Sequence, residues 1–189
     1  DQAQLTGMVA SLKRDAGIER DTEETVGRIL ADVCREGLAA VFRHTEAFDG
    51  VRLDERSFRI SPEVMAEALA RLRREQAQLI QDLQGMADGI RRFAQAQRAV
   101  LQDVDLVLPG GGRARERWLP LQTAGVYIPG GRAFYPSTLA MTVIPAQVAG
   151  VSRIVGVTPP RPEGPDPLGL APGALLGLEE LYTGGGAPA

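Results

Sequence analysis

The stretch that decides the fold is GVYIPGGRAFYPSTLAMTVIPAQVAGVSRIVGVTPP, residues 125–160. Its first four residues form an apolar run that ends in Pro-Gly-Gly, which is typical of a buried strand stopped by a turn. The Tyr-Pro-Ser-Thr sequence that follows predicts a helix start, with Pro136 at an early helical position or Ser137 as the N-cap. Gly150 predicts the end of that helix, and residues 153–157 are predicted to form the returning strand.

The helix between these two strands is apolar around most of its circumference, so we expect it to be buried. The apolar residues are Leu139, Met141, Val143, Ile144 and Val148. Two strands joined by one helix form a βαβ unit, and its right-handed crossover makes the strands parallel neighbours. The glycine turn then lies at the carboxyl end of its strand, which is where open α/β sheets bind ligands.

Length and composition indicate a globular protein of one domain or two small ones, since 44% of the 189 residues are apolar. The net charge is only -3 and the basic residues are scattered, so nucleic acid is not an expected partner. We expect no membrane association either, because no run is long and apolar enough to span a bilayer and no signal peptide is visible. The single cysteine, Cys34, excludes an internal disulfide and fits the reducing cytoplasm, which is the expected location.

The first part of the chain has helical periodicity, and we assign residues 1–102 to a helical arm or dimerisation region. Residues 1–19 show a weak helical pattern. Capping signals at Asp21 and at Ser61 predict the starts of further helices. Two apolar stripes after Ser61 indicate a pair of helices that break within residues 73–77.

From residue 103 onward the hydrophobic period changes from helical to alternating. Residues 103–118 predict an exposed hairpin whose turn is Pro-Gly-Gly-Gly. After the βαβ unit we predict a loop over residues 159–172, a short helix over 173–177 and a third strand over 178–182. The predicted fold class is therefore α/β, an N-terminal helical arm followed by a hairpin and the first βαβαβ part of an incomplete Rossmann-like doubly wound sheet, in a domain of residues 103–189.

Three other features are better explained by structure than by chemistry. The basic residues 113–118 could indicate RNA contact, but Glu116 interrupts them and we favour the return strand of the hairpin. His44 and Cys34 do not make a zinc site, which needs about four ligands, or three with an open position. We interpret His44 as a surface or packing residue and Cys34 as a small core residue. Pro-Gly-Gly at residues 129–131 is by itself only a turn, and no Gly-x-Gly-x-x-Gly phosphate loop is present.

The central stretch resembles the ordered motif series of the histidinol dehydrogenase family. The motifs are Tyr-Ile-Pro-Gly-Gly, Tyr-Pro-Ser-Thr, Ile-Pro-Ala-x-Val-Ala-Gly-Val and Val-x-Val-Thr-Pro-Pro, within residues 127–160. The helical region is similar as well, so the resemblance extends from about residue 19 to Ala189. It corresponds to the first part of the family's usual length. We therefore expect an N-terminal fragment or shortened form that is inactive alone.

The resemblance implies that this chain carries residues for NAD. In the family a tyrosine of the first motif contacts the cofactor, and the corresponding residue here is Tyr127. Pro129, Gly130 and Gly131 would let the backbone approach the cofactor, since glycine has no side chain to obstruct it. Ser137 matches the serine of the second motif, which implies a place near the substrate.

The resemblance also implies a chemistry that this chain cannot complete. Family members oxidise L-histidinol through L-histidinaldehyde to L-histidine, pass two hydrides to two NAD molecules and act as homodimers. They hold one zinc ion through Gln, Asp and two His side chains and use a Glu-His pair for proton transfer. These residues correspond to positions beyond Ala189, so we expect no metal ligand and no catalytic residue here. Pro188 replaces a glutamine that contacts NAD in the family, and proline offers neither an amide side chain nor a backbone N–H.

Two alternatives to the dehydrogenase interpretation stay open. The chain could be a non-catalytic binding or assembly module derived from the family, because a sheet of about three strands leaves an unpaired edge and uncovered apolar surface. Such a module would bind a partner chain or dimerise. The second alternative is a bare nucleotide-binding domain, against which the missing phosphate loop and Pro188 both argue.

Overall fold

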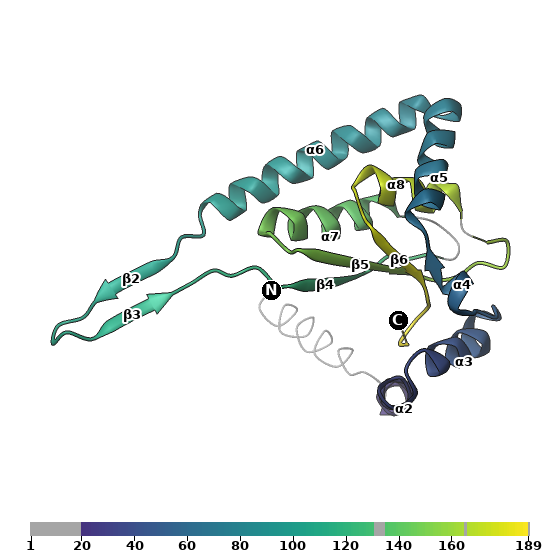
Figure 1. Cartoon of the computed structure of the whole chain (residues 1–189), viewed down its shortest axis with the longest axis horizontal. Coiled ribbons are helices and arrows are strands. Elements are labelled where there is room, and N and C mark those ends of the chain that lie inside the picture. Colours follow the sequence, from purple (N-terminus) through teal and green to yellow (C-terminus); the bar gives the residue numbers. More distant parts are fainter. Residues whose placement is uncertain (1–19, 131–134, 165, 189) are drawn as a thin grey trace, which may run out of the picture.

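A four-stranded sheet with helices stacked on one of its faces organises the molecule (Figure 1). The computed structural model describes residues 20–130, 135–164 and 166–188. The strand order is β1-β6-β5-β4, in which β4, β5 and β6 are parallel and β1 is antiparallel to β6. The strands are β1 (Arg59–Ile60), β4 (Thr123–Tyr127), β5 (Arg153–Thr158) and β6 (Glu180–Thr183). The predicted βαβαβ part of a Rossmann-like sheet is thereby confirmed, and β1 is an additional strand that was not predicted.

Helix α7 (Pro136–Ala149) connects β4 to β5, as predicted. Tyr135 is its N-cap and Pro136 its first residue, so the first of the two proposed starts is correct. Gly150 ends the helix with a φ of 88°, a conformation that glycine adopts without steric cost.

The prediction that α7 is buried around its circumference is wrong for Met141, which is 60% exposed. The helix packs through Leu139, Val143 and Ile144, each of which is fully buried. Val143 and Ile144 lie four and five positions after Leu139 on one side of the helix, whereas Met141 lies on the opposite side. The apolar surface of α7 is therefore larger than the area that the described part of the chain buries.

Helix α8 (Pro167–Leu175) connects β5 to β6 and begins earlier than predicted. Asp166 is its N-cap and accepts a hydrogen bond from the Leu168 N–H at 2.9 Å, and Pro167 is its first residue. The prediction of a loop as far as residue 172 is therefore wrong for its last six positions. Aspartate followed by proline is an ordinary helix start, but it lies among prolines and glycines that suggest irregular chain.

Helices α5 (Pro62–Glu75) and α6 (Ala77–Ala99) form an outer layer over α8 and α7. The break between them at Gln76 falls within the predicted interval. Met65 of α5 is almost fully buried against Gly173 of α8, where an added Cβ would lie 3.2 Å from the methionine sulfur. The buried residues of these helices and of the sheet form one core, which therefore includes chain on both sides of residue 102.

Three further helices precede the sheet, and the predicted helical segment 1–19 lies outside the described residues. These helices are α2 (Arg20–Glu36), α3 (Leu38–Asp49) and α4 (Glu55–Phe58). Asp21 lies inside the first turn of α2 and not at its N-cap. The prediction that Cys34 is a core residue is wrong, since its side chain is exposed. The inner side of α2 carries the buried Ile29 and the half-buried Val33, and the next residue, Cys34, points away from that side.

The predicted hairpin is confirmed as β2 (Val104–Val107) paired with β3 (Arg113–Glu116). Its turn is closed by a 2.7 Å hydrogen bond from the Leu108 N–H to the Gly112 carbonyl. Gly110 and Gly111 both have positive φ values, which explains the glycine run. In Figure 1 the hairpin projects from the sheet and helices as a separate arm.

The two faces of the sheet differ in how the described chain covers them. Val126, Gly156 and Leu181 are in register on adjacent strands and face α7 and α8. Gly125 and Tyr127 lie on the opposite face of β4 and are exposed. Parallel sheets are normally covered on both faces, so the β4 side of this second face is open to a further layer.

Gly156 sits where the sheet packs most tightly, and we predict that Gly156→Ala lowers the free energy of unfolding by about 1–3 kcal/mol. An added Cβ would lie 2.9 Å from Leu178 Cδ2, 3.0 Å from Leu181 Cδ1 and 3.2 Å from Ile128 Cδ1, so all three side chains would have to shift. Gly125→Ala is the matched control, because its Cβ would meet no atom within 4 Å on the open face. Denaturant unfolding of both variants tests this, and equal losses would contradict it.

Arg153 and Glu180 form an ion pair across β5 and β6, with two hydrogen bonds of 2.6 Å. The Arg153 guanidinium lowers the pKa of Glu180 from its ordinary 4.5 to about 2. Because the pKa is lower in the folded state, the pair stabilises the protein above about pH 4.5, and this contribution is lost as the pH falls toward 2.

We therefore predict that Glu180→Gln reduces the stability at neutral pH and makes it less sensitive to acid between pH 4.5 and 2. Denaturant unfolding at a series of pH values measures both effects. Glu179→Gln is the control, since Glu179 is exposed and forms none of the ion pairs found in the described ranges. An unchanged acid dependence in the Glu180 variant would refute the assignment.

Candidate functional site: a cleft at the carboxyl edge of the parallel sheet

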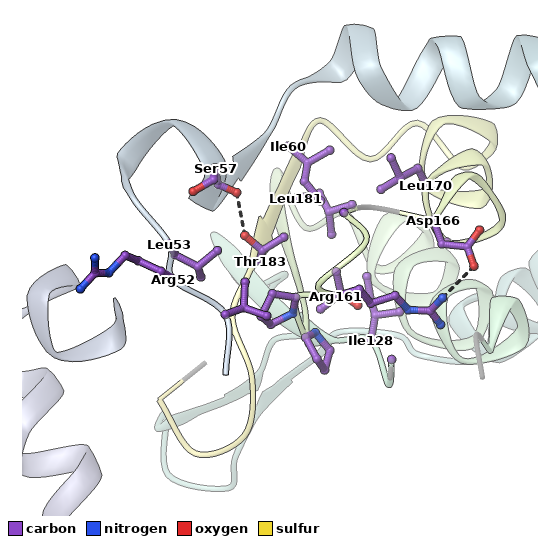
Figure 2. A pocket seen from close by; sticks show the side chains of 17 residues that line it. Arg52, Leu53, Ser57, Ile60, Ile128, Arg161, Asp166, Leu170, Leu181 and Thr183 are labelled. Carbon is purple, nitrogen blue, oxygen red and sulfur yellow. Dashed lines mark hydrogen bonds and ion pairs between the residues drawn. The ribbon is translucent and has the colours of Figure 1, made fainter. Parts of the chain in front are cut away.

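The best-formed cleft among the described residues lies where β4, β5 and β6 end (Figure 2). Its volume is about 160 Å³. The floor is apolar and consists of Ile60, Ile128, Leu170 and Leu181. Sites for small molecules typically measure about 300–1,000 Å³, so this cleft is smaller than a typical complete site. The location is the one predicted from the βαβ topology.

One wall of the cleft is formed by the start of α8. Arg161 donates a hydrogen bond to the Asp166 carboxylate at 2.9 Å, and both side chains are partly buried. Asp166 also accepts the hydrogen bond of the Leu168 N–H, so one carboxylate fixes the arginine and the helix start together. This wall therefore presents the Arg161 guanidinium in a fixed position, because its partner Asp166 is itself fixed by the Leu168 N–H.

The other wall is formed by the segment between α3 and β1. Thr183, at the end of β6, donates a hydrogen bond to the Ser57 carbonyl at 2.9 Å or the Phe58 carbonyl at 3.1 Å. Helix α4 is held in turn by Asp54, which accepts hydrogen bonds from the Ser57 and Arg56 N–H groups at 2.7 and 3.0 Å. These bonds, that of Ser57 first, lower the pKa of Asp54. Figure 2 shows the Thr183–Ser57 and Arg161–Asp166 pairs on opposite sides of the cleft.

Gly130 is the one predicted site residue that lines this cleft among those the structure describes. A Cβ there would lie 3.0 Å from Thr158 Oγ1 and 3.1 Å from Pro159 Cδ. The absence of a side chain therefore has a packing cause, the close approach of the β4 and β5 ends. Pro129 precedes it and is half-buried, and Gly131 lies outside the described residues.

Tyr127 points away from the floor of the cleft. It lies on the open face of β4 and is 46% exposed, whereas its neighbours Val126 and Ile128 point into the core. On the same face the end of β6 is covered, since the Phe58 and Tyr182 rings lie 5.0 Å apart. The Tyr127 ring is thus accessible from the solvent side of the sheet.

The remaining predicted site residues lie apart from the cleft lining. Ser137 is exposed in the first turn of α7, and Pro188 is buried in the tail that follows β6. The tail packs on the end of α3, where any side chain at Gly185 would collide with the Asp49 carboxylate. Partial burial there raises the pKa of Asp49.

Sequence reasoning missed most of the cleft walls. Asp166 had a signal, because aspartate before proline marks a helix start. Arg161 and Thr183 had no comparable signal, since their roles depend on partners that the fold brings close. Arg52 and Leu53 come from a segment far from the central motifs in the sequence, and nothing in their pattern pointed to the cleft.

His44 lies away from this cleft, on α3, where its side chain faces α2. Its Nε2 is 3.1 Å from Asp32 Oδ2, and its ring stacks on Phe48 with the ring centres 6.0 Å apart. These contacts confirm a packing role. Within the described ranges no group of three or more His, Cys, Asp or Glu side chains could hold a metal ion. In the same part of the chain, no helix has the length and apolar content to cross a bilayer.

Asp166 supports two contacts, and we predict that Asp166→Ala lowers the free energy of unfolding by about 1 kcal/mol through loss of the helix cap. Asp166→Asn keeps a good capping side chain and removes only the charge that holds Arg161, so it should be less destabilising. Denaturant unfolding separates the two variants. Equal effects of both substitutions would show that the cap contributes nothing.

Comparison with known proteins gives one consistent family. A family model described as histidinol dehydrogenase matches residues 12–189. The histidinol dehydrogenase of Gluconobacter oxydans is 41% identical over 172 residues, which is 90% of this chain and 39% of that protein. That of Methanosarcina barkeri is 40% identical over 182 residues, covering 94% of this chain and 40% of its own length.

A solved structure agrees with these sequence comparisons. The crystal structure of histidinol dehydrogenase from Elizabethkingia anophelis superposes with a TM-score of 0.78 at 29% identity, over 92% of this chain and 39% of that chain. The chain thus spans about 40% of the length of the curated relatives that it matches.

Proposed function

This chain belongs to the histidinol dehydrogenase family, and on that premise we propose that it forms the NAD-binding side of an enzyme that oxidises L-histidinol to L-histidine. The observation that carries the proposal is the position of Tyr127, an exposed aromatic ring on the strand whose carboxyl end forms the cleft. Aromatic side chains at such a position provide flat apolar surface for a ring system. Two successive oxidations, of the alcohol and then of the aldehyde, would use two NAD molecules.

The described residues fit the cofactor in part. NAD, when bound, accepts the hydride that leaves the substrate. Tyr127 would contact it from the open sheet face, and Pro129 and Gly130 would position the backbone at the turn. The tight packing of Gly130 on Thr158 and Pro159 would keep this turn rigid, because a side chain there would push the two strand ends apart. Pro188 is buried and has no N–H, so its backbone can donate no hydrogen bond to the cofactor.

Zinc does not fit the residues of this chain. The only histidine in the sequence, His44, is hydrogen-bonded to Asp32, and its ring stacks on Phe48. A zinc site needs at least three protein ligands. We propose that the metal, the acid–base groups and the contacts to L-histidinol other than Ser137 are supplied by polypeptide outside these residues, in a cytoplasmic homodimer.

The NAD proposal predicts that Tyr127→Ala weakens NAD binding by about three- to tenfold, since one aromatic contact is worth about 0.5–1.5 kcal/mol. Isothermal titration calorimetry of NAD into the 189-residue chain measures this. Phe93→Ala is the control, because Phe93 is a similarly exposed aromatic residue, 67% accessible, on the outer helix α6. A loss of affinity in both variants, or in neither, would contradict the assignment.

The same preparation tests whether the oxidation of L-histidinol needs polypeptide outside these residues. We expect no L-histidinol-dependent NADH formation by the chain alone, and rapid turnover would show that its own residues are sufficient.

The alternative of a non-catalytic assembly module is favoured by a separate observation, the exposed hairpin arm. Absence of any NAD binding, together with stable self-association, would support that alternative over the dehydrogenase proposal.

A further inference from the structure

The chain that follows β6 lies on the open face of the sheet, one strand away from Tyr127. Tyr127, Val157 and Tyr182 are in register on adjacent parallel strands, so their side chains point to the same face. A Cβ on Gly184 would lie 3.5 Å from Val157 Cγ1, which places the start of the tail, residues 184–188, over β5. In Figure 1 the tail runs from β6 toward α3, on the side of the sheet opposite α7 and α8. The tail backbone and the exposed Tyr127 ring therefore both border Val157 on this face.

The glycine at position 185 is required by space and not by backbone conformation. Gly186 has a φ of 61°, in the region that favours glycine, whereas Gly185 does not have a positive φ. A Cβ at position 185 would collide with Asp49 Oδ2 and would lie 3.1 Å from the carboxylate carbon. The Asp49 carboxylate thus occupies the space that a side chain on the tail would need. This contact fixes how close the tail can lie to α3.

Asp49 stands where a carboxylate is locally unfavourable. It is the last residue of α3, and the carbonyl groups at a helix C-terminus carry partial negative charge. Partial burial also raises its pKa, and within the described ranges no hydrogen bond or ion pair opposes this effect. Residues that break a local rule in this way are expected at functional sites more than elsewhere.

The end of α3 is held independently of the tail. The Gly50 N–H donates a hydrogen bond to the Glu46 carbonyl at 3.1 Å and closes the last turn. The His44 Nε2, one turn earlier, lies 3.1 Å from Asp32 Oδ2 and links α3 to α2. Asp49 is therefore presented to the tail from a helix end whose position is already set.

We propose that Asp49 is a positioning residue for the NAD site, which holds the tail against α3 and so sets the gap between the tail backbone and the Tyr127 ring. This role rests on the proposed function, because Tyr127 is taken as the contact for NAD. Asp49 acts through Gly185 and not on the cofactor itself. A planar ring that packs on Tyr127 then meets the tail backbone at its edge. The carboxylate therefore fixes the shape of the site rather than its charge.

Calorimetric titration of NAD into the 189-residue chain tests the positioning role. Asp49→Ala should weaken binding about five- to tenfold, because the tail loses the contact that places it. Asp49→Asn has nearly the same shape and should restore binding to within about twofold of the wild type. Glu75→Ala is the matched control, since Glu75 is likewise the last residue of a helix, α5, and is exposed. Equal losses in the Asp49→Ala and Asp49→Asn variants, or in the control, would overturn the proposal.

Gly185→Ala tests the contact itself. Alone, the added methyl group should collide with the carboxylate, displace the tail and weaken NAD binding as much as Asp49→Ala does. In the Asp49→Ala background that space is empty, so the same substitution should cause less than about a twofold further loss. Losses that simply add would show that the two residues act separately and would overturn the proposal.

Thiol labelling follows the tail without NAD. C34S removes the only cysteine of the chain, and A187C then places a thiol on the tail. We expect Asp49→Ala to speed the reaction of this thiol with a maleimide at least about threefold, because a displaced tail is more accessible. The thiol introduced by A99C, at the end of α6, should react at an unchanged rate.

The labelling result separates failure of the Asp49 contact from failure of the NAD proposal. An unchanged rate at position 187 would overturn the role of Asp49 whatever the calorimetry gives. Faster labelling in a chain that binds no NAD would instead support the contact between Asp49 and the tail and refute the proposed function.

Discussion

The close packing of apolar side chains over Gly156 is the constraint on which the rest of the structure depends. Because this residue has no side chain, Leu178, Leu181 and Ile128 meet directly above the central strand. These three side chains belong to the same core as the buried residues of α7 and α8, and α6 and α5 pack on those two helices. The same strand, β5, ends at Thr158, which lines the cleft together with Pro159. Strand β5 therefore contributes both to the packing of the core, through Gly156, and to the cleft, through Thr158.

The sequence predicted those parts of the fold that depend on residues close together in the chain. The βαβ unit, the hairpin and the α5–α6 break follow from period, capping residues and glycine turns, and all are present. The start of α8 was missed because Asp166 and Pro167 lie in a stretch rich in residues that usually break helices. Strand β1 had no local signal at all, since two residues become a strand only by pairing with Leu181 and Tyr182.

The site was predictable in position but only partly in composition. Topology placed the cleft at the carboxyl edge of the sheet. Of the residues selected by the family resemblance, Gly130 lines the cleft and Tyr127 lies on the open face of β4. The cleft walls instead come from contacts between remote segments, such as Thr183 with Ser57, which no pattern in either segment reveals. The resemblance explained the glycine at position 130 by the approach of a cofactor. Its neighbours Thr158 and Pro159 explain it by packing, because they leave no room for a side chain with or without a ligand.

The link between Thr183 and the Ser57 and Phe58 carbonyls joins segments more than 120 residues apart. It bears on how the protein is made. During synthesis, α3, α4 and β1 leave the ribosome long before β6, and their docking partners do not yet exist. The cleft wall can therefore close only after β6 has left the ribosome, so the synthesis of this strand is the step that completes the wall. Contacts of such long sequence separation slow folding, and the early helices must stay soluble in the meantime.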